Sequence, residues 1–153
     1  MNSKIKKYLL NAGWYKNRDV DISQCVKSFS KDNINLTPPS ISFMKEYYNL
    51  KIKIIAEFEK MSGKIITIYI NSHSCIDPEL LNKYNEHYNK ILIPVADCYD
   101  YAMIILIDEC GKFYGASDQF ISIIGNNFEE VLENMVNGVI NTIEFKWDVI
   151  EDF

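Results

Sequence analysis

Two short motifs carry residue types that could do chemistry, the adjacent carboxylates Asp108-Glu109 and the nearby His73 and Cys75. Adjacent acids can serve acid–base catalysis or hold a divalent metal, and a thiol near an imidazole can act as a nucleophile. However, Cys110-Gly111 follows the two acids, which is typical of a hairpin turn in which Gly111 takes a positive φ. The chain has only two His, a poor supply of metal ligands. We therefore expect no catalytic residue, no metal site and no cofactor.

The four cysteines show no spacing typical of a zinc site or a redox pair. Each of them lies among apolar residues, as free thiols in protein cores do. The sequence therefore predicts reduced, buried thiols at all four positions, which are Cys25, Cys75, Cys98 and Cys110.

The net charge of −5 argues against direct binding of DNA or RNA, because contact with phosphates requires a dense positive surface. Acidic residues recur in the second half of the chain, which favours a partner with a basic surface. The segment Cys98-Tyr99-Asp100-Tyr101 alternates acidic and aromatic residues between two apolar stretches, so part of it is exposed in any strand register. This segment is our candidate for the loop that recognises such a partner.

Arg18 is the only arginine of the chain, and it lies near Trp14, Asp19 and Asp21. A guanidinium is planar and forked, so it can bridge hydrogen-bond acceptors or stack on an aromatic ring. We expect Arg18 to contact Trp14 or Asp21 and to fix the first helix on the domain. In that role, Arg18→Lys lowers the melting temperature.

Those residues must be positioned by helices, and five segments have the apolar spacing and the end signals of helices. Gly13 is a natural end for the first helix, and Trp14 can then fold back on its apolar face. Asp21 and Gln24 resemble a capping box, and Pro38-Pro39 separates the second helix from the third. The predicted helices cover residues 3–12, 21–29, 40–49, 77–90 and 127–139.

Strands are predicted where apolar residues alternate or form short runs between turn signals. Residues 51–58 and 65–70 form one antiparallel hairpin, and the turn at 108–111 joins a second one. Pro94 marks its strand as a sheet edge or a bulge, because proline cannot donate a hydrogen bond to a neighbouring strand. The predicted strands cover residues 51–58, 65–70, 91–95, 103–107, 112–116 and 120–124, and residues 145–149 form a closing strand or a tail.

Helices laid against a mostly antiparallel sheet make an α+β fold, and the length of 153 residues fits one domain over residues 1–153. No run approaches the roughly 20 apolar residues that span a bilayer. The first residues also lack the apolar core of a signal peptide. We therefore expect a cytoplasmic protein that does not enter a membrane.

Taken in order, several of these segments resemble the SUKH superfamily of bacterial immunity proteins, in particular its third group. The resemblance covers nearly the whole chain. The segments that carry it are 9–14, Arg18 with 20–21, Pro38 before Phe43, 47–50, the helix from Asp77, 93–95, 105–109 with Gly111 and Tyr114, and 124–125 leading into 129–132.

The resemblance implies an α+β domain without catalytic activity, with N-terminal helices and a C-terminal helix packed on a mostly antiparallel sheet. It also implies that the domain binds and neutralises a cognate toxin. Toxins associated with the superfamily are often nucleases, which need a basic cleft for phosphates. The acidic composition of this chain suits such a partner, because charge complementarity steers association.

We expect the toxin-binding surface to combine acidic and aromatic side chains, and we expect a second set of residues to have structural roles. The surface set is Asp97, Tyr99, Asp100, Tyr101, Asp108, Glu109 and Asp118. The structural set is Gly13, Trp14, Arg18, Pro94 and Gly111.

Two other classes of function stay open, the first of which needs the same sequence features. One is an intracellular scaffold or regulatory module that binds a protein other than a toxin. The other is an enzyme that uses Asp108-Glu109 or His73 with Cys75. The sequence specifies neither the toxin nor the oligomeric state, because one fold can serve unrelated partners.

Overall fold

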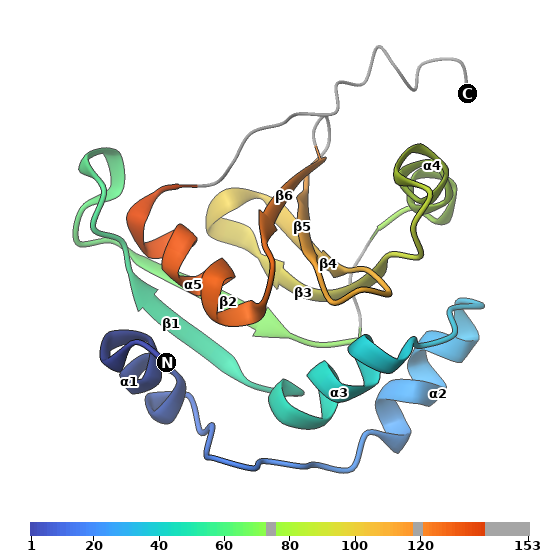
Figure 1. Ribbon diagram of the computed structural model, residues 1–153, viewed down its shortest axis with the longest axis horizontal. Coiled ribbons are helices and arrows are strands. Elements are labelled where there is room, and N and C mark those ends of the chain that lie inside the picture. Colours follow the sequence, from blue (N-terminus) through green and yellow to red (C-terminus); the bar gives the residue numbers. More distant parts are fainter. Residues whose placement is uncertain (73–75, 118–120, 140–153) are drawn as a thin grey trace.

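The computed structural model describes residues 1–72, 76–117 and 121–139, shown in colour in Figure 1. This part of the chain forms five α-helices and a six-stranded antiparallel sheet, which confirms the predicted α+β fold. The helices are α1 (Ser3–Asn11), α2 (Ser23–Lys31), α3 (Pro38–Tyr47), α4 (Pro78–Tyr88) and α5 (Phe128–Asn137). The strands are β1 (Lys51–Ile55), β2 (Ile65–Ile70), β3 (Ile93–Cys98), β4 (Met103–Ile107), β5 (Phe113–Ala116) and β6 (Ile121–Gly125).

The strands follow one another across the sheet in chain order, from β1 to β6. Both predicted hairpins are confirmed: β1 pairs with β2 so that Ile54 lies opposite Ile66, and β4 pairs with β5 so that Leu106 lies opposite Tyr114. A short 3-10 helix, η2 (Tyr99–Tyr101), connects β3 to β4.

The two faces of the sheet are covered differently. A large core joins the apolar sides of α1, α2, α3 and α5 to one face, where alternate residues such as Ile52 and Ile68 are fully buried. A smaller core on the other face packs Leu81 and Tyr84 of α4 against Leu106 and other residues of β4–β6. Figure 1 shows α4 standing apart from the other helices. Side chains of β3 on this second face therefore lie on the same side of the sheet as α4, apart from the large core.

Several helix ends were predicted correctly from the sequence, because capping depends on a few local residues. Asp77 caps α4, and Asn127 caps α5 by accepting a hydrogen bond from the backbone N–H of Glu130 at 2.8 Å. Gly13 follows α1 with φ at +102°, a conformation that favours glycine, and Trp14 is buried beyond it.

Two helix starts differ from the prediction. α3 begins at Pro38 and not at Ser40, because Thr37 and Ser40 form the capping box and a proline in the first turn loses no intrahelical hydrogen bond. α2 begins at Ser23, and the predicted capping box of Asp21 with Gln24 does not form. The Asp21 carboxylate instead accepts a hydrogen bond from the backbone N–H of Ser23 at 2.9 Å.

Pro94 lies in β3, which is an interior strand between β2 and β4. The register of β3 against β4 shifts between Pro94 and Ala96. A bulge removes the need for one ladder hydrogen bond, which is how an interior strand tolerates proline. The predicted bulge is therefore confirmed, and the alternative of a sheet edge is wrong.

The thiols differ in exposure. Cys25 and Cys98 are buried as predicted, but Cys110 is exposed because it lies in the turn between β4 and β5. Burial raises the pKa of Cys25 to about 11 and that of Cys98 to about 12. His73, Cys75 and the predicted strand at 145–149 lie outside the described residues.

Candidate functional site

A cavity of about 310 Å³ lies between the beginning of α4 and the sheet, where β3, η2 and β4 meet. Asp97 and Tyr99, both predicted as surface residues, line it together with Asp77 of the α4 cap. The remaining described lining residues are mainly apolar, such as Leu80 and Met103, and none is a lysine or an arginine. The cavity therefore combines an apolar interior with carboxylates.

Asp97 is the most deeply placed acid of this cavity, with 7% of its surface exposed. It lies opposite Tyr69 in the pairing of β2 with β3, so both side chains lie on the face away from the large core. Its Oδ2 atom accepts a hydrogen bond from the Asn71 side-chain amide at 2.9 Å. Burial raises the pKa of the Asp97 carboxyl, and the Asn71 hydrogen bond opposes that shift. Among the described residues, no cation forms an ion pair with Asp97.

Tyr99 and Asp100 form the exposed part of η2. Tyr99 is 75% exposed, and its ring lies 5.8 Å from that of Tyr69. The Asp100 carboxylate accepts a hydrogen bond from the backbone N–H of Thr67 at 2.8 Å, beyond the two residues through which β2 pairs with β3. Asp100 thus holds η2 against β2, although it is itself exposed.

Tyr101 was predicted to lie on the same surface, but it points to the other side of the sheet. Its hydroxyl donates to the backbone carbonyl of Met135 in α5 at 3.1 Å, and its ring packs against the large core. Burial raises its pKa to about 12. Tyr101 therefore fastens η2 to α5, which explains why the neighbouring Tyr99 is held outward.

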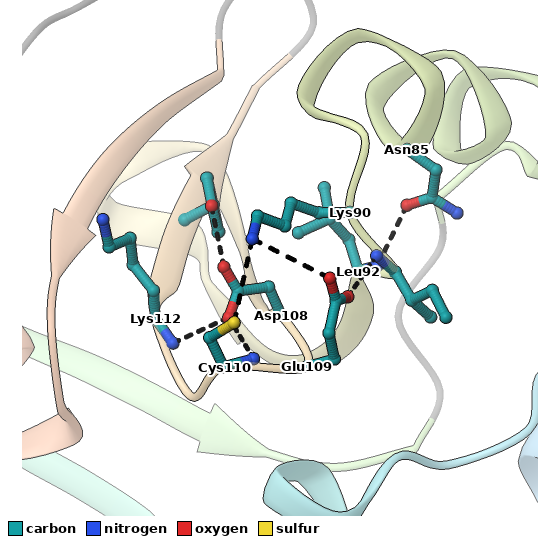
Figure 2. A network of polar contacts seen from close by, with 9 residues as sticks. Asn85, Lys90, Leu92, Asp108, Glu109, Cys110 and Lys112 are labelled. Atoms are coloured by element: carbon teal, nitrogen blue, oxygen red, sulfur yellow. Dashed lines mark hydrogen bonds and ion pairs between the residues drawn. The ribbon is translucent and has the colours of Figure 1, made fainter.

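Asp108 closes the turn between β4 and β5 and is only 1% exposed. Figure 2 shows its polar contacts from close by. Its Oδ1 atom accepts hydrogen bonds from the backbone N–H groups of Cys110 and Lys112, at 2.8 and 2.9 Å. Its Oδ2 atom accepts one from the Tyr114 hydroxyl at 2.9 Å. This carboxylate has its partners within the hairpin, so it is not available to a binding partner.

Glu109 joins the same turn to the segment that precedes β3 (Figure 2). One of its oxygens accepts a hydrogen bond from the backbone N–H of Ile91 at 2.5 Å, and the other lies 3.9 Å from Lys90 Nζ. The Lys90 ammonium also lies 3.7 Å from the Cys110 sulfur. Gly111 completes the turn with φ at +88°. The two acids are therefore parts of one hydrogen-bonded turn.

The seven residues predicted for one surface thus lie in separate places. Asp97, Tyr99 and Asp100 lie before β4, whereas Asp108 and Glu109 lie after it, and five strand residues span roughly 17 Å. Asp118 lies outside the described residues. We keep Asp97, Tyr99 and Asp100 as the candidate binding site, together with Asp77.

Arg18 binds the C-terminal end of α3. Its guanidinium donates to the backbone carbonyls of Glu46 and Tyr48, at 2.5 and 2.8 Å. The Trp14 indole N–H donates to the Glu46 carboxylate at 2.9 Å. Of the two expected neighbours, Trp14 shares Glu46 with Arg18, whereas the Asp21 carboxylate accepts hydrogen bonds from the backbone N–H and hydroxyl of Ser23. The carbonyls at the end of a helix attract the cation instead.

Sequence reasoning missed the contribution of Asp77 and Leu80 to the cavity. The sequence around Asp77 predicted a helix cap. A capping signal depends only on neighbouring residues, so it does not predict which part of the sheet the capped helix end lies against. A second hollow, of about 810 Å³, lies between the segment that joins α2 to α3 and the side of α4, and includes Asn33 and Asn82. Of the predicted residues it contains only Pro94 of the structural set, and none of the predicted toxin-binding set.

Two further properties bear on possible functions. None of the described helices is long and apolar enough to cross a membrane. The described residues also contain no group of three or more His, Cys, Asp or Glu arranged to hold a metal ion.

A family model described as SUKH-3 immunity protein matches residues 1–138, a span that includes every helix and strand described above. No curated protein and no solved structure matches the chain.

Proposed function

The chain belongs to the SUKH-3 immunity protein family, and from this membership we propose that it binds and neutralises a cognate bacterial toxin. The observation that carries this proposal is the family match over residues 1–138. In this role the protein acts by occupying its partner and needs no reaction of its own.

We further propose that the toxin presents a basic active-site surface, as nuclease-type toxins do. The net charge of −5 supports this proposal, because opposite charges accelerate encounter between proteins. The cavity with Asp77 and Asp97 supports it as well, since no lysine or arginine lines it among the described residues. We place this activity in the cytoplasm and assign it to one domain over residues 1–153.

The proposal is tested by finding the partner and measuring its effect on cells. The purified full-length chain is used to capture proteins from a lysate of its source strain, at low and at high salt. Each captured protein is then expressed alone and together with this chain. We expect one of them to stop growth alone and to be harmless in co-expression.

The class of toxin is tested in the same cells. Degradation of DNA or RNA during expression of the captured protein supports a nuclease, and intact nucleic acids contradict that part of the proposal. If no captured protein is toxic, and all are housekeeping proteins, the immunity function is contradicted.

A further inference from the structure

We propose that the cavity beside Asp97 receives one arginine side chain of the toxin, with the guanidinium placed against the Asp97 carboxylate. This inference rests on the proposed function and adds to it the chemical group that is recognised. Three independent properties of the cavity carry it: its size and lining, its unbalanced charge, and its exposed aromatic rim.

The size of the cavity suits a single side chain. Its volume of about 310 Å³ lies at the lower end of the roughly 300–1,000 Å³ found for small-molecule sites. Ile76, Leu80 and Ile104 provide apolar surface for the methylene groups of a long cationic side chain. A charged group at the end of such a chain then reaches the carboxylates.

The charge of the cavity is negative and lacks a counterion from the described residues. Asp97 is 7% exposed, and among the described residues only Asn71 donates a hydrogen bond to its carboxylate, at Oδ2. A buried carboxylate without a cation is unfavourable, so a guanidinium that reaches its second oxygen gains both an ion pair and hydrogen bonds.

The same arrangement disfavours an anion, although the N-terminus of α4 lies close by. Asp77 Oδ1 accepts a hydrogen bond from the backbone N–H of Glu79 at 2.9 Å, so this helix end already has a carboxylate. A second anion in the cavity would face the charges of Asp77 and Asp97.

The rim of the cavity adds an aromatic ring. Tyr99 is 75% exposed, and aromatic faces attract guanidinium groups. The neighbouring Tyr69 already has a cation near its ring, since Lys51 Nζ lies 5.3 Å from the ring centroid. Arginine and tyrosine are also among the residues that contribute most to protein interfaces.

The test uses the full-length chain and two small molecules that differ in charge. N-acetyl-arginine methylamide is titrated into the ¹⁵N-labelled protein, and N-acetyl-citrulline methylamide serves as the neutral control of nearly the same shape. We expect only the arginine compound to shift backbone amide signals, and the shifts to gather at Asp97, Ala102 and Met103. An equal response to both compounds, no response to either, or shifts located elsewhere would overturn the proposal.

Variants then assign the effect to the cavity. Asp97→Asn removes the charge and keeps an oxygen for the Asn71 amide, so we expect affinity for the arginine compound to fall roughly tenfold or more. Glu86→Gln is the matched control, because Glu86 is an exposed acid of α4 that does not line the cavity. Tyr99→Ala, at an exposed position, is expected to weaken binding by a smaller factor and does not depend on the folding of Asp97→Asn. Unchanged affinity in the Asp97 and Tyr99 variants contradicts the inference.

The same variants separate this inference from the proposed function. If the toxin is neutralised equally by the wild-type and Asp97→Asn chains, the inference is wrong and the immunity function stands. If the arginine compound binds as expected but no toxin is neutralised, the immunity function is wrong and the cation site stands without its partner.

Discussion

The guanidinium of Arg18 and the backbone carbonyl of Tyr48 are joined by a hydrogen bond of 2.8 Å between residues 30 positions apart in the chain. A second bond, to the carbonyl of Glu46, makes the guanidinium a bridge to the end of α3. The segment that follows α1 is thereby fixed to a helix on which the large core depends.

We predict that Arg18→Lys lowers the free energy of unfolding by about 1–2 kcal/mol, because a single ammonium group does not reproduce the forked pair of bonds. Urea denaturation followed by circular dichroism measures this change. Lys16→Arg, at an exposed position of the same segment, is the control and should leave stability unchanged. Equal stability of Arg18→Lys and the wild type would show that the bridge contributes nothing.

We predict that Asp108→Ala destabilises the protein by roughly 2–3 kcal/mol, since the part-buried backbone donors of Cys110 and Lys112 lose their acceptor and the Tyr114 hydroxyl loses its partner. Tyr114→Phe removes one of the three bonds and should cost about 1 kcal/mol. Thermal unfolding is the measurement, with neutralisation of the toxin measured in parallel. Reduced neutralisation without reduced stability would return Asp108 to the toxin-binding surface.

We predict that Tyr99→Ala lowers affinity for the toxin roughly tenfold or more without changing the melting temperature, as exposed aromatic anchors do at interfaces. Isothermal titration calorimetry with the purified toxin measures the affinity. Tyr15→Ala is the matched control, because Tyr15 is 55% exposed and lies outside the candidate site. A similar loss in both variants would show that the candidate site has no special role.

We predict that Asp97→Asn is more stable than the wild type at pH 7, and that the difference shrinks as the pH falls. Burial raises the folded-state pKa of Asp97, so folding favours its protonated form. Ionisation therefore lowers stability above that pKa, and this loss disappears at or below the usual Asp range near 4.

Asp21→Asn provides a control of opposite sign for this pH dependence. Hydrogen bonds from Ser23 lower the pKa of Asp21, so its ionised form contributes stability that is lost as the pH falls. The difference in melting temperature between each variant and the wild type, measured from pH 3 to pH 8, should therefore change in opposite directions for Asp97→Asn and Asp21→Asn. Parallel trends would contradict the assignment of a buried charge at Asp97.

We predict that Cys110 reacts with a maleimide in the native protein, whereas Cys25 and Cys98 react only after unfolding. Cys110 is exposed, and the other two thiols are buried with raised pKa values, which leaves little thiolate for attack. Mass spectrometry of peptides after a short reaction locates the label. Early labelling of Cys98 would show that the connection from β3 to β4 opens readily.

Local signals in the sequence predicted most of the fold. The cap at Asn127, the turn at 108–111 and the alternation in β1 each depend on residues that are close in the chain, and the structure has all three. The position of Pro94 left a choice between an edge and a bulge, because the neighbours of a strand are set by the whole sheet.

Features that depend on distant segments could not be predicted in this way. The burial of Asp108 follows from Tyr114 reaching back across the hairpin, and the partners of Arg18 belong to a helix 28 and 30 residues away. The cavity is lined by both Asp77 and Asp97. One is a helix cap and the other lies in a strand, and their separate local signals do not predict that they line the same cavity. The exposed tip at Tyr99 was recognised because alternation leaves one side of such a segment outside in any register.

The strand order affects how quickly the protein folds after synthesis. Each strand pairs with the next one in the chain, and apart from the β2–β3 connection, which contains α4, these pairings close short loops, which favours fast folding. The sheet can assemble progressively during translation, and the last helix then joins the first when Glu129 of α5 accepts a hydrogen bond from the backbone N–H of Asn2. A newly made chain is therefore expected to fold soon after its last helix is synthesised, which under the proposed function makes each new molecule available to the toxin early.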